Sequence, residues 1–94
     1  MALLSDEQIA ASLEGREWRR EGETLVRDWR FADFSAAIAF VERVAEVAEA
    51  SNHHPDILVH GWNKVRLTLS THSEGKVTQA DHDLAAGIDG LGVG

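Results

Sequence analysis

The chain of 94 residues contains no cysteine and only one proline. Without cysteine it has no disulfide framework, no thiolate metal site and no cysteine nucleophile, which fits a reducing compartment. No segment approaches the ~18 apolar residues of a membrane span. The N-terminal stretch MALLSDE lacks the basic region and the apolar core of a signal peptide. We therefore expect a cytoplasmic protein with no membrane partner.

Positive charge is also scarce, because nine Lys and Arg residues stand against 16 Asp and Glu residues and the formal net charge is −7. Nucleic-acid binding needs a basic footprint, so we expect no nucleic-acid partner. The basic cluster at residues 16–20 is interleaved with glutamates, which is typical of a solvated surface. The length of 94 residues and the apolar content of 44% predict a single domain over residues 1–94.

Three helices are predicted, and each begins at a capping residue. A capping box at residues 5–8 opens a helix over residues 6–13. Asp33 caps the longest helix, in which apolar residues recur with i, i+3, i+4, i+7 spacing. A second capping box at Thr78–Asp81 opens the last helix, and the glycine-rich residues 87–94 are expected to fray.

Four strands are predicted from short runs of alternating apolar and polar residues. They cover residues 17–20, 24–31, 57–60 and 65–71. In the second strand Leu25, Trp29 and Phe31 fall on one face, but Arg27 interrupts the alternation. The order helix, strand, strand, helix, strand, strand, helix predicts an α+β fold in which three helices cover one face of a four-stranded antiparallel sheet.

The long helix carries a second apolar face, formed by Phe40 and Val47. This face fits either a wide contact with the core, which we favour, or an interface between subunits. The exposed edges of the predicted sheet must likewise be protected or used for association.

Three of the five histidines, at positions 53, 54 and 72, form a candidate proton-transfer group. Histidine can give or take a proton near neutral pH. His53 and His54 precede a proline, where the chain leaves regular structure, and a hairpin could bring His72 beside them. Glu49 stands four residues before His53, so a continued helix would place its carboxylate where it orients that imidazole. Such a group suits general acid–base catalysis.

Two other interpretations of these histidines stay open. A histidine pair in a polar loop is often only solvated, and three histidines can also bind zinc. The metal site is the weaker alternative, because neighbouring side chains diverge and no predicted helix carries two histidines four residues apart. We therefore expect no metal, and we interpret His60 and His82 as surface or turn-packing residues.

The three tryptophans and Asp81 also need an interpretation. Trp29 fits the core face of a strand, whereas Trp18 and Trp62 fit either a packing role or the wall of a pocket for a flat ring. Asp81 is explained by its capping box without any further role.

Taken together, these residues resemble the signature of the pterin-4a-carbinolamine dehydratases. That pattern has a charged residue four positions before a histidine, then histidine or asparagine, then a small residue or proline. An aromatic residue, a histidine or tryptophan, and an aspartate follow at set spacings. Its positions here are Glu49, His53, His54, Pro55, Trp62, His72 and Asp81. The stretches at residues 29–34 and 62–72 also resemble the family, and the resemblance covers residues 13–90.

The resemblance implies a fold and a reaction. Members of the family have a four-stranded antiparallel sheet with three helices on one face, and they form homodimers or homotetramers. They are lyases that remove water from 4a-hydroxytetrahydropterin, which gives quinonoid dihydropterin and recycles tetrahydrobiopterin for aromatic amino-acid hydroxylases. The reaction uses one acid and one base. The resemblance therefore implies a pterin substrate and no metal, phosphate or redox cofactor.

The resemblance also implies roles for individual residues. His53 and His72 are the expected acid–base pair. His54 is expected to bind substrate and exchange protons, with Glu49 behind the histidines. The expected substrate contacts are Asn52, Ser70, Thr71, Ser73, Trp18 and Asp81. Some family members also bind the helical dimerisation segment of a transcription factor. A protein-binding coactivator, using the second apolar face of the long helix, is therefore the alternative function.

Overall fold

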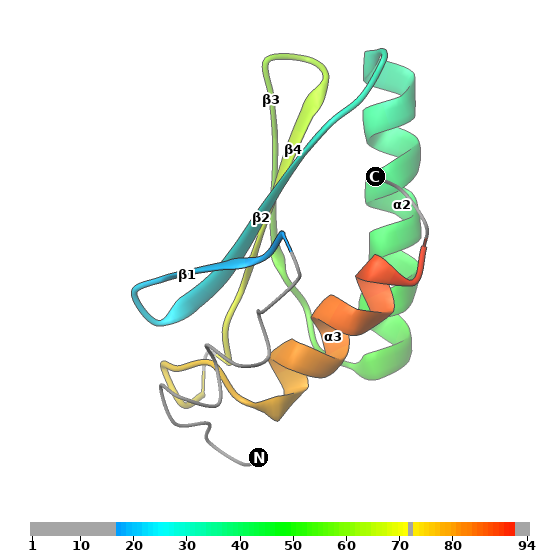
Figure 1. Ribbon diagram of the computed structural model, residues 1–94. Helices are drawn as coiled ribbons and strands as arrows, with labels where there is room; N and C mark the ends of the chain where they lie inside the picture. Colours follow the sequence, from blue (N-terminus) through cyan, green and yellow to red (C-terminus); the bar gives the residue numbers. More distant parts are fainter. Residues whose placement is uncertain (1–16, 72, 92–94) are drawn as a thin grey trace.

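The computed structural model describes residues 17–71 and 73–91, which form an α+β fold (Figure 1). Its elements are β1 (Arg19–Glu21), β2 (Thr24–Arg30), α2 (Phe34–Ser51), β3 (Asp56–His60), β4 (Lys64–Leu69) and α3 (Gln79–Asp89). The helix predicted over residues 6–13 lies outside the described residues, and within them α2 and α3 are the two helices. Neither α2 nor α3 is long and apolar enough to span a bilayer.

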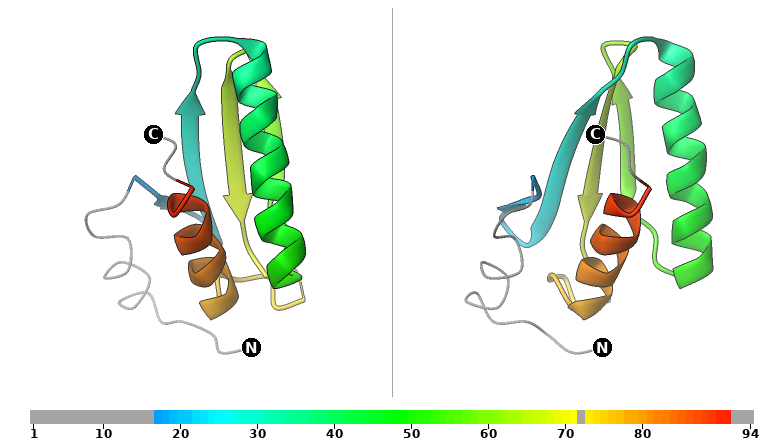
Figure 2. Two further views of the ribbon diagram at one scale, coloured as in Figure 1. Left: turned by 90° about the vertical axis from the view of Figure 1, so that its right-hand side faces the viewer. Right: turned by 45° about the vertical axis from the view of Figure 1, so that its right-hand side comes forward.

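The four strands form one antiparallel sheet in the order β1-β2-β4-β3. β2 and β4 pair at its centre, with Trp29 opposite Val65, and β3 lies at an edge, with His60 opposite Lys64. Both described helices lie on the same face of the sheet and leave the opposite face uncovered (Figures 1 and 2). The predicted antiparallel sheet is confirmed.

One hydrophobic core joins the sheet to both helices. Its residues are Leu25, Trp29, Val65, Leu67 and Leu69 from the sheet, Ala37, Phe40, Val44 and Ala48 from α2, and Leu84, Ala85 and Ile88 from α3. Full burial of one large apolar side chain of this kind contributes about 1.5–3 kcal/mol. The alternation that predicted the strand at residues 65–71 arises because every second side chain of β4 enters this core.

The second apolar face of α2 belongs to the same core. The Phe40 ring centre lies 4.8 Å from that of Trp29 and 5.1 Å from that of Phe31. The side chain of Phe40 is 2% exposed, and Val47 packs against the core as well. The favoured interpretation, a wide contact with the core, is therefore confirmed.

Arg27 interrupts the apolar side of β2 because its charge is paired there. Its guanidinium lies 2.8 Å from the carboxylate of Asp89 on α3 and 3.0 Å from that of Glu17. The same group lies 4.5 Å from the centre of the Trp29 ring. A charge is tolerated on a core-facing side when it is paired and stacked on an aromatic ring. Arg27 therefore ties α3 to the sheet.

α3 continues beyond the point where fraying was predicted. The helix runs to Asp89, so the prediction of a frayed tail is wrong for residues 87–89. A Cβ atom on Gly87 would lie 3.1 Å from Cγ1 of Val47. Glycine at this position thus allows a close approach of the two helices, which composition alone does not distinguish from flexibility.

Candidate active site

The two histidines that follow α2 point in different directions. The helix ends at Ser51, and Asn52 adopts the left-handed backbone conformation with a φ of 51°. The N–H group of His53 then donates to the carbonyl of Ala48 at 3.1 Å, which closes the helix end. After this turn the side chain of His53 is 12% exposed, whereas that of His54 is 57% exposed.

His53 is held by a carboxylate at the start of α3. Its Nε2 atom lies 2.6 Å from Oδ1 of Asp81, a residue that is fully buried. A carboxylate on one ring nitrogen fixes the orientation and tautomer of an imidazole. Within the described residues Nδ1 of His53 has no hydrogen-bond partner.

The other oxygen of Asp81 is fixed by two donors. Oδ2 accepts from the backbone N–H of Thr78 at 2.9 Å and from the hydroxyl of Thr71 at 3.0 Å. The two threonine hydroxyls lie 2.6 Å apart. Because the Thr71 proton goes to Asp81, Thr78 must donate to Thr71. Asp81 thus caps α3 as predicted and also holds His53, so both of its oxygens are engaged within the protein.

Glu49 is paired with His54 and not with His53 as expected. Its Oε2 atom lies 2.6 Å from Nε2 of His54, and both side chains are exposed. The expectation assumed that helical geometry persists through His53. It fails because Asn52 leaves the helix in the left-handed region and turns His53 toward α3.

His53 and His54 line a pocket of about 270 Å³. Its lining residues are Asn52, His53, His54, Pro55, Asp56, Ser70, Thr71 and Ser73. They come from the connection between α2 and β3, from the first residue of β3 and from the segment after β4, which meet near the start of α3 (Figure 2). The structure therefore brings four of the expected substrate contacts together with the histidine pair.

Thr71 lines this pocket and is held there by several hydrogen bonds. Its hydroxyl is bonded to Asp81, and its N–H donates to the carbonyl of Lys76 at 2.9 Å. Its own carbonyl accepts from Glu74 at 2.9 Å and Gly75 at 2.8 Å. With these groups engaged, Thr71 shapes the loop after β4 and supports Asp81.

His72 lies outside the described residues, although Thr71 and Ser73 on either side of it line the pocket. The prediction that His72 joins His53 stays a prediction. Among the residues that the structure describes, no group of three or more His, Cys, Asp or Glu side chains is arranged to hold a metal.

Asp56 is a pocket residue that the sequence did not single out. It follows Pro55 directly, and its place next to the histidine pair was the available signal. Thr78 was recognised only as a helix cap, because the capping box accounts for it fully in sequence.

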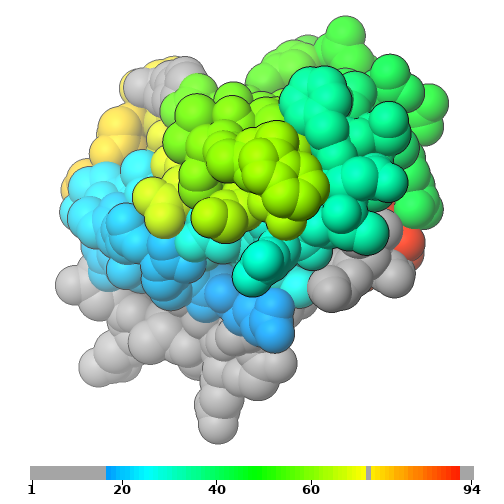
Figure 3. All heavy atoms as spheres, turned by 90° about the horizontal axis from the view of Figure 1, so that it is seen from above, coloured from blue at the N-terminus to red at the C-terminus, as the bar shows by residue number. Residues whose placement is uncertain are grey.

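Trp18 and Trp62 do not line this pocket. Trp18 is buried in the core, where its Nε1 donates to Asp89 at 2.9 Å and its ring meets Trp29 edge to face. The expected contact of Trp18 with substrate stays a prediction. Trp62 is 60% exposed in the turn between β3 and β4. Figure 3 shows this turn beside the start of α2, whose Phe34 is also exposed.

Comparison with known proteins gives the same family as the sequence signature. The family model described as pterin 4 alpha carbinolamine dehydratase matches residues 2–91. The chain belongs to the pterin-4-alpha-carbinolamine dehydratase family. A protein from Nocardia farcinica, provisionally named as such a dehydratase, is 52% identical over 95% of this chain and 94% of its own length. A relative from Chloroflexus aurantiacus with the same provisional name is 50% identical over 95% of this chain and 96% of its own.

Solved structures of the pterin dehydratase family share this fold. A transcriptional coactivator/pterin dehydratase from Brucella melitensis has a TM-score of 0.87 at 32% identity, covering 95% of this chain and 97% of its own. A pterin dehydratase-like protein described as a RuBisCO assembly factor of the alpha-carboxysome has a TM-score of 0.67 at 26% identity. That comparison covers 82% of this chain and 90% of the other chain.

Proposed function

We propose that this chain is a dehydratase that removes water from 4a-hydroxytetrahydropterin and forms quinonoid dihydropterin. Membership of the family and the provisional names of its relatives support this proposal. The observation that carries it is the His53–Asp81 pair, which presents an oriented imidazole at a polar pocket of about 270 Å³.

The reaction is a balanced proton transfer that needs one acid and one base. The bond between C4a and the hydroxyl oxygen breaks, and the hydroxyl takes a proton and leaves as water. The proton on N5 is removed, so that the nitrogen electron pair forms the double bond to C4a. No net electrons enter or leave, and positioned side chains with pKa values near the working pH are the usual catalysts for such steps.

In the proposed mechanism His53 and His72 are the acid–base pair. Asp81 keeps the His53 ring in place by a hydrogen bond to Nε2 of His53. The other ring nitrogen, Nδ1, then exchanges the proton with the substrate. Asn52, Ser70 and Ser73 supply polar contacts to the donors and acceptors of the pterin ring.

His54 has a separate role in this mechanism. It is exposed and paired with Glu49, so it exchanges protons with solvent and contributes to substrate binding. This division of labour follows from the burial of the two rings, because His53 is shielded and His54 is not.

The reaction would supply quinonoid dihydropterin for reduction, within tetrahydrobiopterin recycling. A homodimer or homotetramer is proposed as well, because β3 forms an edge of the sheet and its Ile57 and Leu58 are exposed. Light scattering measures the molar mass of wild type and of Leu58→Lys. The wild type should be larger than a monomer and the variant smaller than the wild type. A wild type that is monomeric contradicts this proposal. No coactivator function is proposed, because Phe40 and Val47 are used by the core.

A stopped-flow assay of 4a-hydroxytetrahydropterin loss tests the proposed reaction. Wild-type protein should accelerate the loss over buffer, whereas His53→Ala and His72→Ala should each lower the rate by about 10²–10⁴. Circular dichroism checks that the variants fold. Failure of folded wild-type protein to accelerate the reaction contradicts the proposed function.

A further inference from the structure

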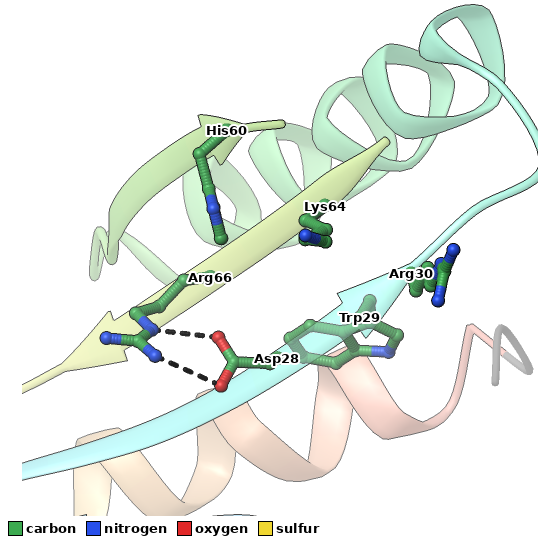
Figure 4. Close-up of a pocket in the computed structure, with 6 residues that line it drawn as sticks. All are labelled: Asp28, Trp29, Arg30, His60, Lys64 and Arg66. Carbon is green, nitrogen blue, oxygen red and sulfur yellow. Dashed lines mark hydrogen bonds and ion pairs between the residues drawn. The ribbon is translucent and has the colours of Figure 1, made fainter. Parts of the chain in front are cut away.

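A second pocket lies on the face of the sheet that the described helices leave uncovered. It encloses about 320 Å³ and is lined by Asp28, Trp29, Arg30, His60, Lys64 and Arg66 (Figure 4). Its residues come from β2, β3 and the hairpin end of β4, whereas the histidine pocket lies beyond the other end of β4. Along the chain, Arg66 of this pocket and Ser70 of the histidine pocket are four residues apart, which is roughly 13 Å at about 3.3 Å per residue.

The pocket gathers cations in an acidic chain. Three of the nine Lys and Arg residues line it, although the formal net charge of the chain is −7. In the sheet register Arg30 stands directly opposite Lys64, and Lys64 stands directly opposite His60. Like charges opposite one another in neighbouring strands are destabilising, so the Arg30–Lys64 pair in this row is unfavourable without an anion.

The one carboxylate of the pocket does not neutralise this row. Asp28 accepts from Arg66 at 2.8 and 3.3 Å and from Arg19 at 3.0 Å, so it already serves two guanidinium groups. In Figure 4 the dashed lines join Asp28 to Arg66. Within the described residues, the side chains of Arg30, Lys64 and His60 make no hydrogen bond or ion pair.

We propose that this second pocket binds a small phosphate monoester, whose phosphoryl oxygens are held by Arg30 and Lys64. A phosphate monoester carries a charge of about −1.5 to −2 at pH 7, which balances both unpaired cations, whereas a monocarboxylate balances one. Guanidinium and ammonium groups are the usual donors to phosphate. A volume of about 320 Å³ also leaves room for an organic remainder beside the phosphate, because small-ligand pockets begin at roughly 300 Å³.

The direct test is an NMR titration of the full chain with phenyl phosphate and with inorganic phosphate, at constant ionic strength. Saturable shifts should appear in the amides of residues 28–30 and 64–66. Inorganic phosphate should shift the same amides, and tighter binding of phenyl phosphate assigns the monoester as the ligand. Phenylacetate, a monocarboxylate of similar size, should bind more weakly than phenyl phosphate.

Variants of opposite sign sharpen the test. Lys64→Gln and Arg30→Gln should each weaken phenyl phosphate binding roughly tenfold, which is the loss of one charge-assisted hydrogen bond. Asp28→Asn should tighten binding, because it frees Arg66 and Arg19. Lys76→Gln, a matched change of an exposed lysine outside the pocket, should leave binding unchanged.

A second measurement uses the protein without ligand. Lys64→Gln removes one charge from the row, so its melting temperature should equal or exceed that of wild type, and the rise caused by phenyl phosphate should shrink. The proposal is overturned if the amide shifts caused by phenyl phosphate map to the histidine pocket, or if chloride causes the same amide shifts. It is also overturned if Lys64→Gln binds normally, or if tetraglutamate binds more tightly than phenyl phosphate, which indicates an acidic protein segment as the partner.

Discussion

Nε2 of His53 and Oδ1 of Asp81 lie 2.6 Å apart, although 28 residues separate them in the sequence. The contact joins the end of α2 to the start of α3. It gives one buried carboxylate two tasks, because Asp81 caps its own helix through Thr78 and orients an imidazole at the pocket. In the proposed mechanism, stability and proton transfer therefore depend on the same side chain.

Replacing Asp81 by Asn should separate these two tasks. The amide oxygen can still accept from the Thr78 N–H, but the side chain loses its charge and one of its acceptors. We expect kcat for 4a-hydroxytetrahydropterin dehydration to fall roughly tenfold or more, a part of the 10²–10⁴ that acid–base catalysis supplies. KM should change little if Asp81 acts through His53, because both of its oxygens are already bonded to protein groups.

Asp83→Asn is the matched control for this change. Asp83 lies on the exposed side of α3 and accepts a hydrogen bond from Gln79 at 3.0 Å. The kcat of the Asp83→Asn variant should equal that of wild type. Equal kcat values for the two variants, both folded by circular dichroism, contradict the positioning role of Asp81.

Thr71 should matter for stability through its hydroxyl. Thr71→Val keeps the shape but removes the donor to Asp81 and the acceptor for Thr78, so about 1–3 kcal/mol of unfolding free energy should be lost. Urea unfolding measures the change. Thr68→Val, on the uncovered face of β4, should cost little, since β-branched residues suit strands. A loss of unfolding free energy in Thr68→Val as large as that in Thr71→Val contradicts this role of Thr71.

Glu49→Gln tests the assignment of Glu49 to His54. Both partners are exposed, and an exposed ion pair contributes about 0.2–1 kcal/mol, so the dehydration rate should fall by at most about fivefold. Comparison with Asp81→Asn in the same assay gives the order of the two effects. A greater loss of rate in Glu49→Gln than in Asp81→Asn indicates that Glu49 serves the catalytic imidazole after all.

Acid unfolding should report on Asp28. Hydrogen bonds from Arg66 and then Arg19 lower the pKa of Asp28 below its ordinary value of 3.8. As the pH falls, Asp28 is therefore protonated in the unfolded chain before it is protonated in the folded protein. Its stabilisation is present above its pKa in the unfolded chain and is lost as the pH drops through its pKa in the folded protein.

In Asp28→Asn, the free energy of unfolding should fall less steeply than in wild type below about pH 4. At neutral pH the difference should stay below about 1 kcal/mol, because the pair is exposed. Urea unfolding over a pH series measures both. Parallel pH curves for the two proteins contradict this assignment.

Local patterns predicted most of the fold. The cap at Asp33, the capping box at Thr78–Asp81 and the alternation in β4 each depend on residues close in sequence, and the structure has these elements. Arg27 was ambiguous because its partner Asp89 lies on α3, far along the chain.

The site was predicted only in part, for a similar physical reason. The histidine pair and the polar residues of the pocket follow from the sequence signature. The partner of each histidine does not, since it depends on the left-handed conformation of Asn52, which few residues other than glycine adopt. That one backbone turn gives Asp81 to His53 and leaves Glu49 to His54.

The most direct test compares the dehydration rates of His53→Ala and His54→Ala with that of wild type in one stopped-flow series. The account predicts a loss of about 10²–10⁴ for His53→Ala and a distinctly smaller loss for His54→Ala, because the shielded ring held by Asp81 carries the proton transfer. Full activity in His53→Ala, or a larger loss in His54→Ala, would contradict the central assignment.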